Sequence, residues 1–173
     1  MDINIFYGYY SSMKMSNVVF CGKPSNYKKI DNSVSRSAQP KAEDFKWLKK
    51  QGVTDVVNFR TMYVAGQDFE EKTVVEKNGM RYHNIPSYTR TPTEENVGKF
   101  LDIVEDVKSR GGKAHIHCKA GADRTGMYAW IYKHVNKLGD MKSNKQEMLD
   151  MGHHDKLYPK LIGWIEKLLK KTK

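Results

Sequence analysis

One ten-residue stretch, residues 117–126, places a cysteine and an arginine at a spacing that suits phosphate chemistry. The short apolar segment 114–117 predicts a strand before it, and residues 127–131 predict a mostly buried helix after it. Cys118 would then end a strand, and Arg124 would open a helix. The N–H groups of such a loop converge on one concavity, where the helix dipole adds positive charge. A phosphate would bind there with two oxygens on Arg124, and the same field would favour the nucleophilic thiolate of Cys118.

The stretch resembles the signature H-C-x5-R-[ST] of the cysteine-dependent protein tyrosine phosphatase superfamily, and the chain is similar to its small bacterial dual-specificity-like members. It reads His117, Cys118, five residues, Arg124, Thr125. The resemblance implies that Cys118 attacks phosphorus, that an acid protonates the leaving oxygen, and that water then releases phosphate from the phosphocysteine. It also implies that Thr125 hydrogen-bonds the sulfur, that His117 orients the loop, and that no metal or cofactor is needed. The expected phosphate-binding residues are Lys119, Ala120, Gly121, Ala122, Asp123 and Arg124.

Two roles stay open for Asp123. Many members carry their acid on the loop after the preceding strand, but residues 83–92 contain no aspartate or glutamate. Asp123 resembles the aspartate of a bacterial and mycobacterial branch with Asp-Arg at this position, where it is taken to be the acid; Ala122 stands where that branch commonly has lysine. Alternatively, Asp123 caps the following helix, since a carboxylate is favourable at a helix start.

Strands and helices alternate around this stretch. Residues 34–40, 53–59 and 80–85 are predicted to be extended, and residues 41–51, 68–77, 92–109, 143–151 and the C-terminal segment to be helical. Capping boxes are predicted at residues 91–94, with Thr91 as N-cap and Glu94 in the box, and at residues 143–146, with Ser143 as N-cap. The pattern predicts an α/β fold with a small central, mostly parallel sheet flanked by helices, which the resemblance specifies as protein tyrosine phosphatase-like of the dual-specificity type. The last helix should pack on the sheet through a stripe formed by Tyr158, Leu161, Ile162, Ile165, Leu168 and Leu169.

Three further residues are candidates for the rim of the pocket. Arg60 follows the predicted strand 53–59, and ligands of open α/β sheets bind at that edge. Tyr88 and Arg90 lie on the loop after the next strand. The alternative is that all three are ordinary surface residues. Residues 153–155, His-His-Asp, are expected to form a polar linker rather than a metal site, because adjacent histidines point in different directions and no further ligand is near in sequence.

Composition sets wider expectations. The 173 residues suffice for one phosphatase domain over residues 31–173, preceded by an N-terminal arm over residues 1–30. The net charge of +10 suits a phosphorylated substrate, either a phosphoprotein or a small phosphoester. Because the lysines are scattered, no nucleic-acid partner is expected. No stretch could span a membrane, the start is a poor signal peptide, and Cys21 is left without a disulfide partner; we expect a cytoplasmic monomer.

The main hypothesis is a phosphomonoester hydrolase that resembles dual-specificity protein tyrosine phosphatases. The short chain indicates a shallow pocket that accepts substrates beyond phosphotyrosine. One alternative is a phosphate-binding pseudophosphatase that acts as an interaction module. Another is a phosphatase of phosphoinositides, inositol phosphates or RNA 5′-triphosphate. A lysine follows the cysteine here, at Lys119, as it does in phosphoinositide-directed relatives.

Overall fold

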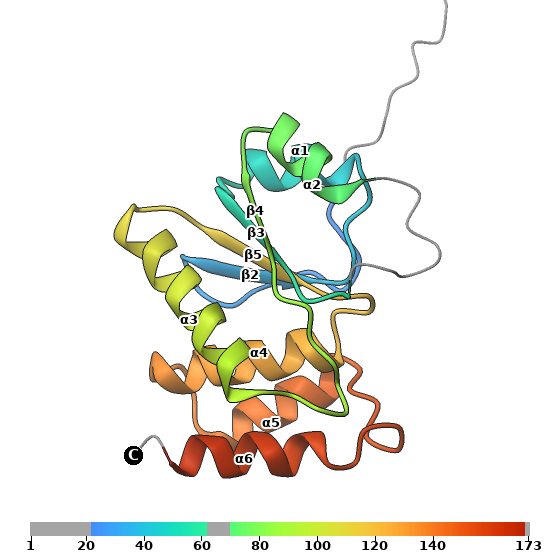
Figure 1. Cartoon of the computed structure of the whole chain (residues 1–173), viewed down its shortest axis with the longest axis vertical. Helices are drawn as coiled ribbons and strands as arrows, with labels where there is room; N and C mark the ends of the chain where they lie inside the picture. The colour runs from blue at the N-terminus through green and yellow to red at the C-terminus, as the bar shows by residue number, and fades with distance from the viewer. Residues whose placement is uncertain (1–21, 62–69, 172–173) are drawn as a thin grey trace, which may run out of the picture.

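The structure is a computed structural model that describes residues 22–61 and 70–171 (Figure 1). Cys21 and the predicted helix start at residue 68 lie outside these residues. Over the described part of the chain, in sequence order, the elements are β1 (Lys28–Lys29), β2 (Val34–Ser37), α1 (Asp44–Lys50), β3 (Asp55–Asn58), α2 (Glu71–Lys77), β4 (Arg81–Asn84), α3 (Glu94–Ser109), β5 (Ala114–His117), α4 (Asp123–Val135), α5 (Met141–Asp150) and α6 (Leu161–Lys170).

The strands form one sheet in the order β1-β2-β5-β3-β4. β2, β5, β3 and β4 are parallel, whereas β1 is antiparallel to β2 at the edge. The predicted α/β fold with a mostly parallel sheet is therefore confirmed. The register pairs His117 with Ser37 on one side and with Asn58 on the other. The chain thus leaves β2, β3 and β5 at the same level, and this places residues 38, 59 and 118 side by side at the carboxyl edge.

Helices cover both faces of the sheet. Figure 1 shows α1 and α2 over one face and α3 and α4 over the other, with α5 and α6 beyond α4. Consecutive valines of β3 face opposite sides of the sheet: Val56 packs in the smaller core under α1 and α2, and Val57 packs in the larger core under α3 and α4. Both faces of this strand are buried, so the position of the loops at its end is fixed firmly.

The last helix differs from the prediction. Leu161, Ile165 and Leu169 are buried as the stripe requires, but α6 packs on α4 and not on the sheet (Figure 1). Tyr158 precedes the helix. The reason is that α4, itself buried along most of its length, already occupies this face of the sheet. None of the helices in the described part of the chain has the length and apolar character needed to cross a membrane.

Both predicted caps are displaced. The N-cap of α3 is Thr93, not Thr91, and its side chain accepts a hydrogen bond from the Asn96 N–H at 3.2 Å. Thr91 instead belongs to the preceding turn, where its N–H donates to Tyr88 O. The N-cap of α5 is Asp140. Its carboxylate accepts from Ser143 N at 2.7 Å while Ser143 Oγ accepts from Asp140 N at 3.0 Å, so Ser143 is the partner within the box rather than the cap.

Candidate active site

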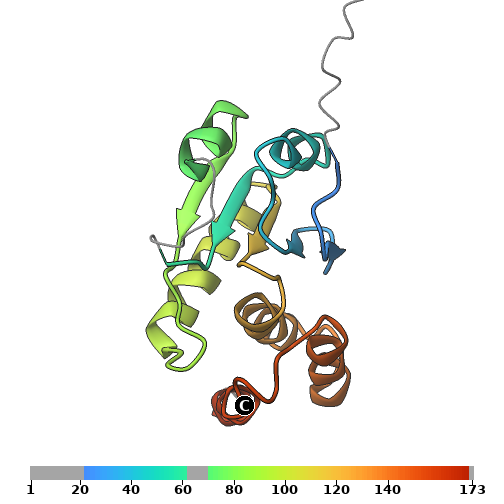
Figure 2. The ribbon, with the colours of Figure 1, turned by 90° about the vertical axis from the view of Figure 1, so that its right-hand side faces the viewer.

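The signature loop, defined as residues 118–124, runs from the carboxyl end of β5 into α4. Figure 2 views the molecule from the side on which β5 passes into this loop. Cys118 lies at the start of this loop and is 2% exposed. α4 begins at Asp123, with Ala122 as its N-cap. The strand, loop and helix predicted from the sequence are therefore in place. Lys119 and Ala120, in the middle of the loop, are exposed.

Three consecutive carbonyls of the loop are held from outside it. Lys119 O accepts from the Gln39 N–H at 3.1 Å, Ala120 O from Asn26 Nδ2 at 3.0 Å, and Gly121 O from Arg36 Nη2 at 2.6 Å. In a planar trans peptide, the N–H of the next residue points opposite to the carbonyl. The N–H groups of residues 120–122 are consequently directed to the inner side of the loop, which is the arrangement of an anion-binding nest.

Gly121 is required by the same packing. Its φ is +71°, and a Cβ there would lie 2.5 Å from Ala38 N and from the Ser37 carbonyl carbon. Both atoms belong to the backbone that follows β2 and cannot move aside as a side-chain tip could. Only glycine lets the loop lie this close to its neighbour.

Arg36 supports the loop from the core and was not predicted. It lies in the interior of β2, is 1% exposed, and its second nitrogen Nη1 is 3.6 Å from Glu147 Oε1. Burial lowers the pKa of Arg36, and the negative charges of Glu147 and Cys118 oppose this shift. Lys28 and Lys133 bind the same carboxylate at 2.8 and 2.9 Å. The available signal was an arginine within a strand whose other residues are small or apolar.

A second buried network lies behind His117. Its Nε2 is 2.8 Å from Glu71 Oε1, and Glu71 Oε2 accepts from Gln39 Nε2 at 2.7 Å and from Asn58 Nδ2 at 3.2 Å. Gln39 Oε1 in turn accepts from Arg60 Nη1 at 2.5 Å. One chain of hydrogen bonds therefore links the signature histidine to the segments after β2 and β3. Glu71 was missed because it reads as an ordinary acidic residue of a helix.

Glu71 makes stability depend on pH. Burial acts to raise the pKa of Glu71, but the attraction of His117 and the hydrogen bonds from His117 and Gln39 outweigh it, so the pKa is lowered from its ordinary value of 4.5. A lowered folded pKa means that the ionised carboxylate contributes stability above pH 4.5, and that this is lost as the pH falls through the folded pKa. We expect Glu71→Gln to lower the melting temperature most near neutral pH, with a difference from wild type that shrinks at acid pH.

The matched control for this measurement is Glu76→Gln, which changes an exposed glutamate of the same helix. Its melting temperature should follow that of wild type at every pH. A difference between Glu71→Gln and wild type that stays constant down to about pH 3 would contradict the role given to the carboxylate charge.

Arg124, at the end of the signature loop, contacts the two segments that carry the predicted rim residues. Its Nη1 donates to Phe59 O at 3.2 Å and to Ser87 O at 3.5 Å, so its guanidinium is placed by the segments after β3 and β4. Arg60 is buried, and burial lowers its pKa; the charges of Glu71, Arg124 and Cys118 contribute smaller effects. The charges of two of the predicted catalytic residues, Cys118 and Arg124, thus act on Arg60, although Arg60 is buried in the wall rather than exposed on a rim.

The other two rim candidates lie further out. Tyr88 is 64% exposed. Arg90 lies over the Tyr158 ring at 5.6 Å and helps to line a surface pocket of about 400 Å³ with Trp164. Both stay candidates for contact with a substrate that extends beyond its phosphate.

Asp123 does not cap α4. Ala122 is the N-cap, and both oxygens of Asp123 are bound by residues 153 and 154, contrary to the cap prediction. The same contacts correct the expectation of a polar linker, because the His153 side chain is buried and pairs with Asp123. The histidines were misjudged because their partner lies 30 residues earlier in the sequence.

Thr125 Oγ1 is buried without a partner among the described residues, so the implied hydrogen bond to sulfur is absent here.

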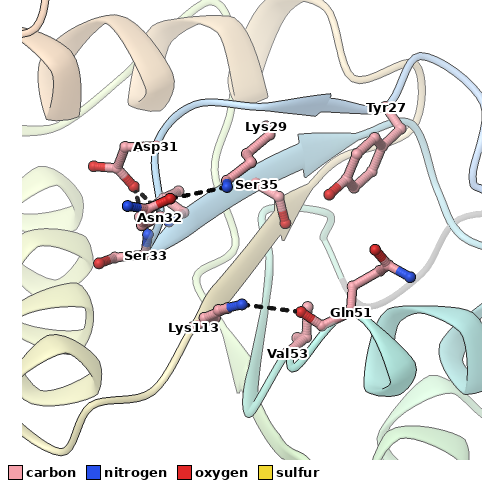
Figure 3. Close-up of a pocket in the computed structure, with 10 residues that line it drawn as sticks. Tyr27, Lys29, Asp31, Asn32, Ser33, Ser35, Gln51, Val53 and Lys113 are labelled. Carbon is pink, nitrogen blue, oxygen red and sulfur yellow. Dashed lines mark hydrogen bonds between the residues drawn. The ribbon is translucent and has the colours of Figure 1, made fainter.

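A polar pocket of about 120 Å³ lies at the opposite edge of the sheet (Figure 3). It is lined near the amino ends of β2 and β5 by residues that include Lys29 and Lys113. These two lysines are bound to Asn32 Oδ1 and to Gln51 O. None of the predicted site residues lines this pocket, so it is separate from the signature loop.

Two plant proteins are similar to part of this chain in sequence. Rice (Oryza sativa subsp. japonica) inositol diphosphatase DSP2 is 25% identical over 128 residues, and Arabidopsis thaliana inositol diphosphatase DSP3 is 27% identical over 110 residues. The alignments cover 66% and 60% of this chain but 56% and 51% of the relatives. The chain therefore spans about half the length of the curated relatives that it matches.

Solved structures agree with this fold at lower identity. A protein from Shewanella putrefaciens CN-32 superposes with a TM-score of 0.75 at 22% identity, covering 86% of this chain and 92% of its own. Pseudomonas aeruginosa TpbA gives 0.69 at 22%, with coverages of 83% and 84%. The core catalytic domain of the Saccharomyces cerevisiae PP-IP phosphatase SIW14 gives 0.66 at 18%, with coverages of 87% and 94%.

A cysteine and an arginine that bracket a loop at the carboxyl edge of a mostly parallel sheet are the features of the tyrosine and dual-specificity phosphatase class. A match to a family model assigns the chain to one family within this class. It belongs to the family described as DSP-PTPase phosphatase fused to NAD+ kinase, whose match covers residues 14–157.

Proposed function

We propose that this protein is a cysteine-dependent phosphatase that hydrolyses phosphomonoesters through a phosphocysteine on Cys118. The observation that carries the proposal is the outward clamping of the carbonyls of residues 119–121, which turns the following N–H groups inward next to Cys118. Together with the α4 dipole, these N–H groups would bind three phosphate oxygens and stabilise the charge that develops on them in the transition state.

The reaction is proposed to run in two displacements. The Cys118 thiolate forms a bond to phosphorus while the bond to the ester oxygen breaks, and Asp123 gives its proton to that oxygen. Water then attacks phosphorus, the P–S bond breaks, and Asp123 takes a proton from the water. Arg124 holds two phosphate oxygens through both steps, as its fork shape allows. His117, held by Glu71 at 2.8 Å, keeps the start of the loop in position.

The substrate class has two candidates. Phosphotyrosine is favoured by the likeness to TpbA, of which a complex with phosphotyrosine is known. An inositol pyrophosphate is favoured by the names of the two plant relatives and of SIW14. Lys119, exposed beside Cys118, and a net charge of +10 suit a ligand with several phosphates. We propose a substrate of one of these classes, in which the bond that breaks is a phosphomonoester in phosphotyrosine and a phosphoanhydride in an inositol pyrophosphate.

The first test is turnover of an aryl phosphate in the presence of a metal chelator. We expect turnover that vanadate inhibits, because vanadate adopts the geometry of the phosphoryl transition state. The ratio of kcat/KM for a phosphotyrosine peptide to that for an inositol pyrophosphate then selects the substrate class. A protein that binds phosphate or vanadate but hydrolyses none of these compounds would instead be a phosphate-binding interaction module.

A further inference from the structure

The carboxylate of Asp123 is enclosed by the segment that follows α5. Asp123 Oδ1 accepts from the His154 N–H at 2.9 Å and lies 2.7 Å from His153 Nδ1. Asp123 Oδ2 lies 2.9 Å from His154 Nδ1. Two adjacent histidines therefore bind the two oxygens of one carboxylate, 30 residues away in sequence, at the start of the signature helix.

The two oxygens have different surroundings. A backbone N–H can only donate, so Oδ1 must act as an acceptor toward His154. The direction of the His153 contact depends on the tautomer of its ring. We assign the proton to Nδ1, so that Oδ1 accepts from His153 as well. The reason is that Nε2 is buried without a hydrogen-bond partner among the described residues, and an unpaired N–H there would cost more than an unpaired lone pair. A proton carried by Asp123 consequently belongs on Oδ2. Within the part of the chain that the structure describes, the hydrogen-bond contact of Oδ2 is with the His154 ring, whose Nδ1 donates or accepts according to its tautomer.

The two histidine side chains also differ in how far they are buried. The His153 side chain is 0% exposed, whereas the His154 side chain is 55% exposed. The first ring is enclosed and serves as a fixed donor, and the second is in contact with water. The segment is itself anchored to the loop, because Asn26 Nδ2 donates to both Met151 O and Ala120 O, at 3.1 and 3.0 Å.

We propose that His153 and His154 are positioning residues for the acid–base chemistry of Asp123. His153 and the His154 main chain fix Oδ1, so that Oδ2 carries the proton that goes to the leaving oxygen and later receives one from the attacking water. The exposed His154 ring orients Oδ2. This inference rests on the proposed function, in which Asp123 is the acid and base.

The experiment measures kcat for aryl phosphates whose leaving groups span a wide range of basicity. His153→Leu removes the donor from a buried site, and His154→Ala removes the ring but keeps the backbone N–H. We expect each variant to lose about tenfold to a hundredfold with poor leaving groups and little with good ones, which is the pattern of a misplaced acid. Asp123→Asn should show the same pattern at greater amplitude.

Conservative variants and a control complete the design. In His153→Asn and His154→Asn the amide N–H occupies the place of Nδ1–H, so most of the activity with poor leaving groups should return. His134→Ala changes a partly exposed histidine near the end of α4 and should behave as wild type. Melting temperatures identify any variant that fails to fold. If His153→Leu does not fold, His154→Ala, at an exposed ring, still decides.

The outcomes separate the two proposals. An unchanged dependence on leaving group, or an equal loss with every substrate, in folded variants would overturn the positioning role and leave the phosphatase proposal intact. Substantial activity of Cys118→Ser in the same assay would overturn the phosphatase mechanism itself.

Discussion

Cys118→Ser is expected to reduce kcat for an aryl phosphate by about ten-thousandfold or more, the scale seen when a catalytic nucleophile is removed. A serine hydroxyl needs a neighbouring base to become nucleophilic, whereas a cysteine loses its proton readily in a positive field. The site offers serine no such base through His117. The Nε2 of His117 binds Glu71 at 2.8 Å, and its Nδ1 lies 3.5 Å from the carbonyl oxygen of Cys118.

A measurement of phosphate binding separates the loss of the nucleophile from damage to the loop. The carbonyl clamps on residues 119–121 do not involve the sulfur, so Cys118→Ser should still bind phosphate or vanadate and keep its melting temperature within a few degrees. Cys21→Ser is the matched control, since Cys21 and Cys118 are the two cysteines of the sequence. It should retain full activity. If Cys118→Ser kept about one percent of wild-type kcat or more, the nucleophile would have to be another group.

The sequence was most informative where the determinants are contiguous. Residues 117–125 carry the signature in one run, and the strand before and the helix after it follow from local apolar patterns. The alternation of strands and helices likewise predicted the mostly parallel sheet. These features depend on neighbours within a few residues, so a single sequence suffices to predict them.

The supporting residues could not be predicted because their partners are distant in the chain. Arg36 binds Gly121 across 85 residues, and His117 binds Glu71 across 46. No periodicity marks such pairs; they arise only when the register of β2, β5 and β3 aligns their carboxyl ends. The displaced caps have a different cause. Thr91 and Thr93 both have side chains that can cap a helix, and the turn formed by Thr91 N–H and Tyr88 O decides between them.

Arg124→Lys is expected to lower kcat/KM by about a hundredfold, although the charge is retained. A guanidinium donates two parallel hydrogen bonds to a phosphate, and an ammonium acts as a point charge that cannot do so. The geometry adds a second reason. Arg124 Nη1 donates to Phe59 O at 3.2 Å and to Ser87 O at 3.5 Å, and among the described residues its Nη2 and Nε stay available for the ligand. One ammonium could not satisfy these carbonyls and two phosphate oxygens in the same fixed geometry.

The measurement is kcat/KM together with the dissociation constant for vanadate. In Arg124→Lys, kcat/KM should fall and the dissociation constant for vanadate should rise. We expect kcat to fall too, because the bidentate contact strengthens as charge moves onto the transferred phosphoryl group. Arg81→Lys is the matched control: Arg81 is exposed at the amino end of β4, with Asp106 3.9 Å away, and should tolerate the change. If Arg124→Lys raised KM alone and left kcat intact, Arg124 would bind substrate without stabilising the transition state, and the N–H groups of the loop would carry that stabilisation by themselves.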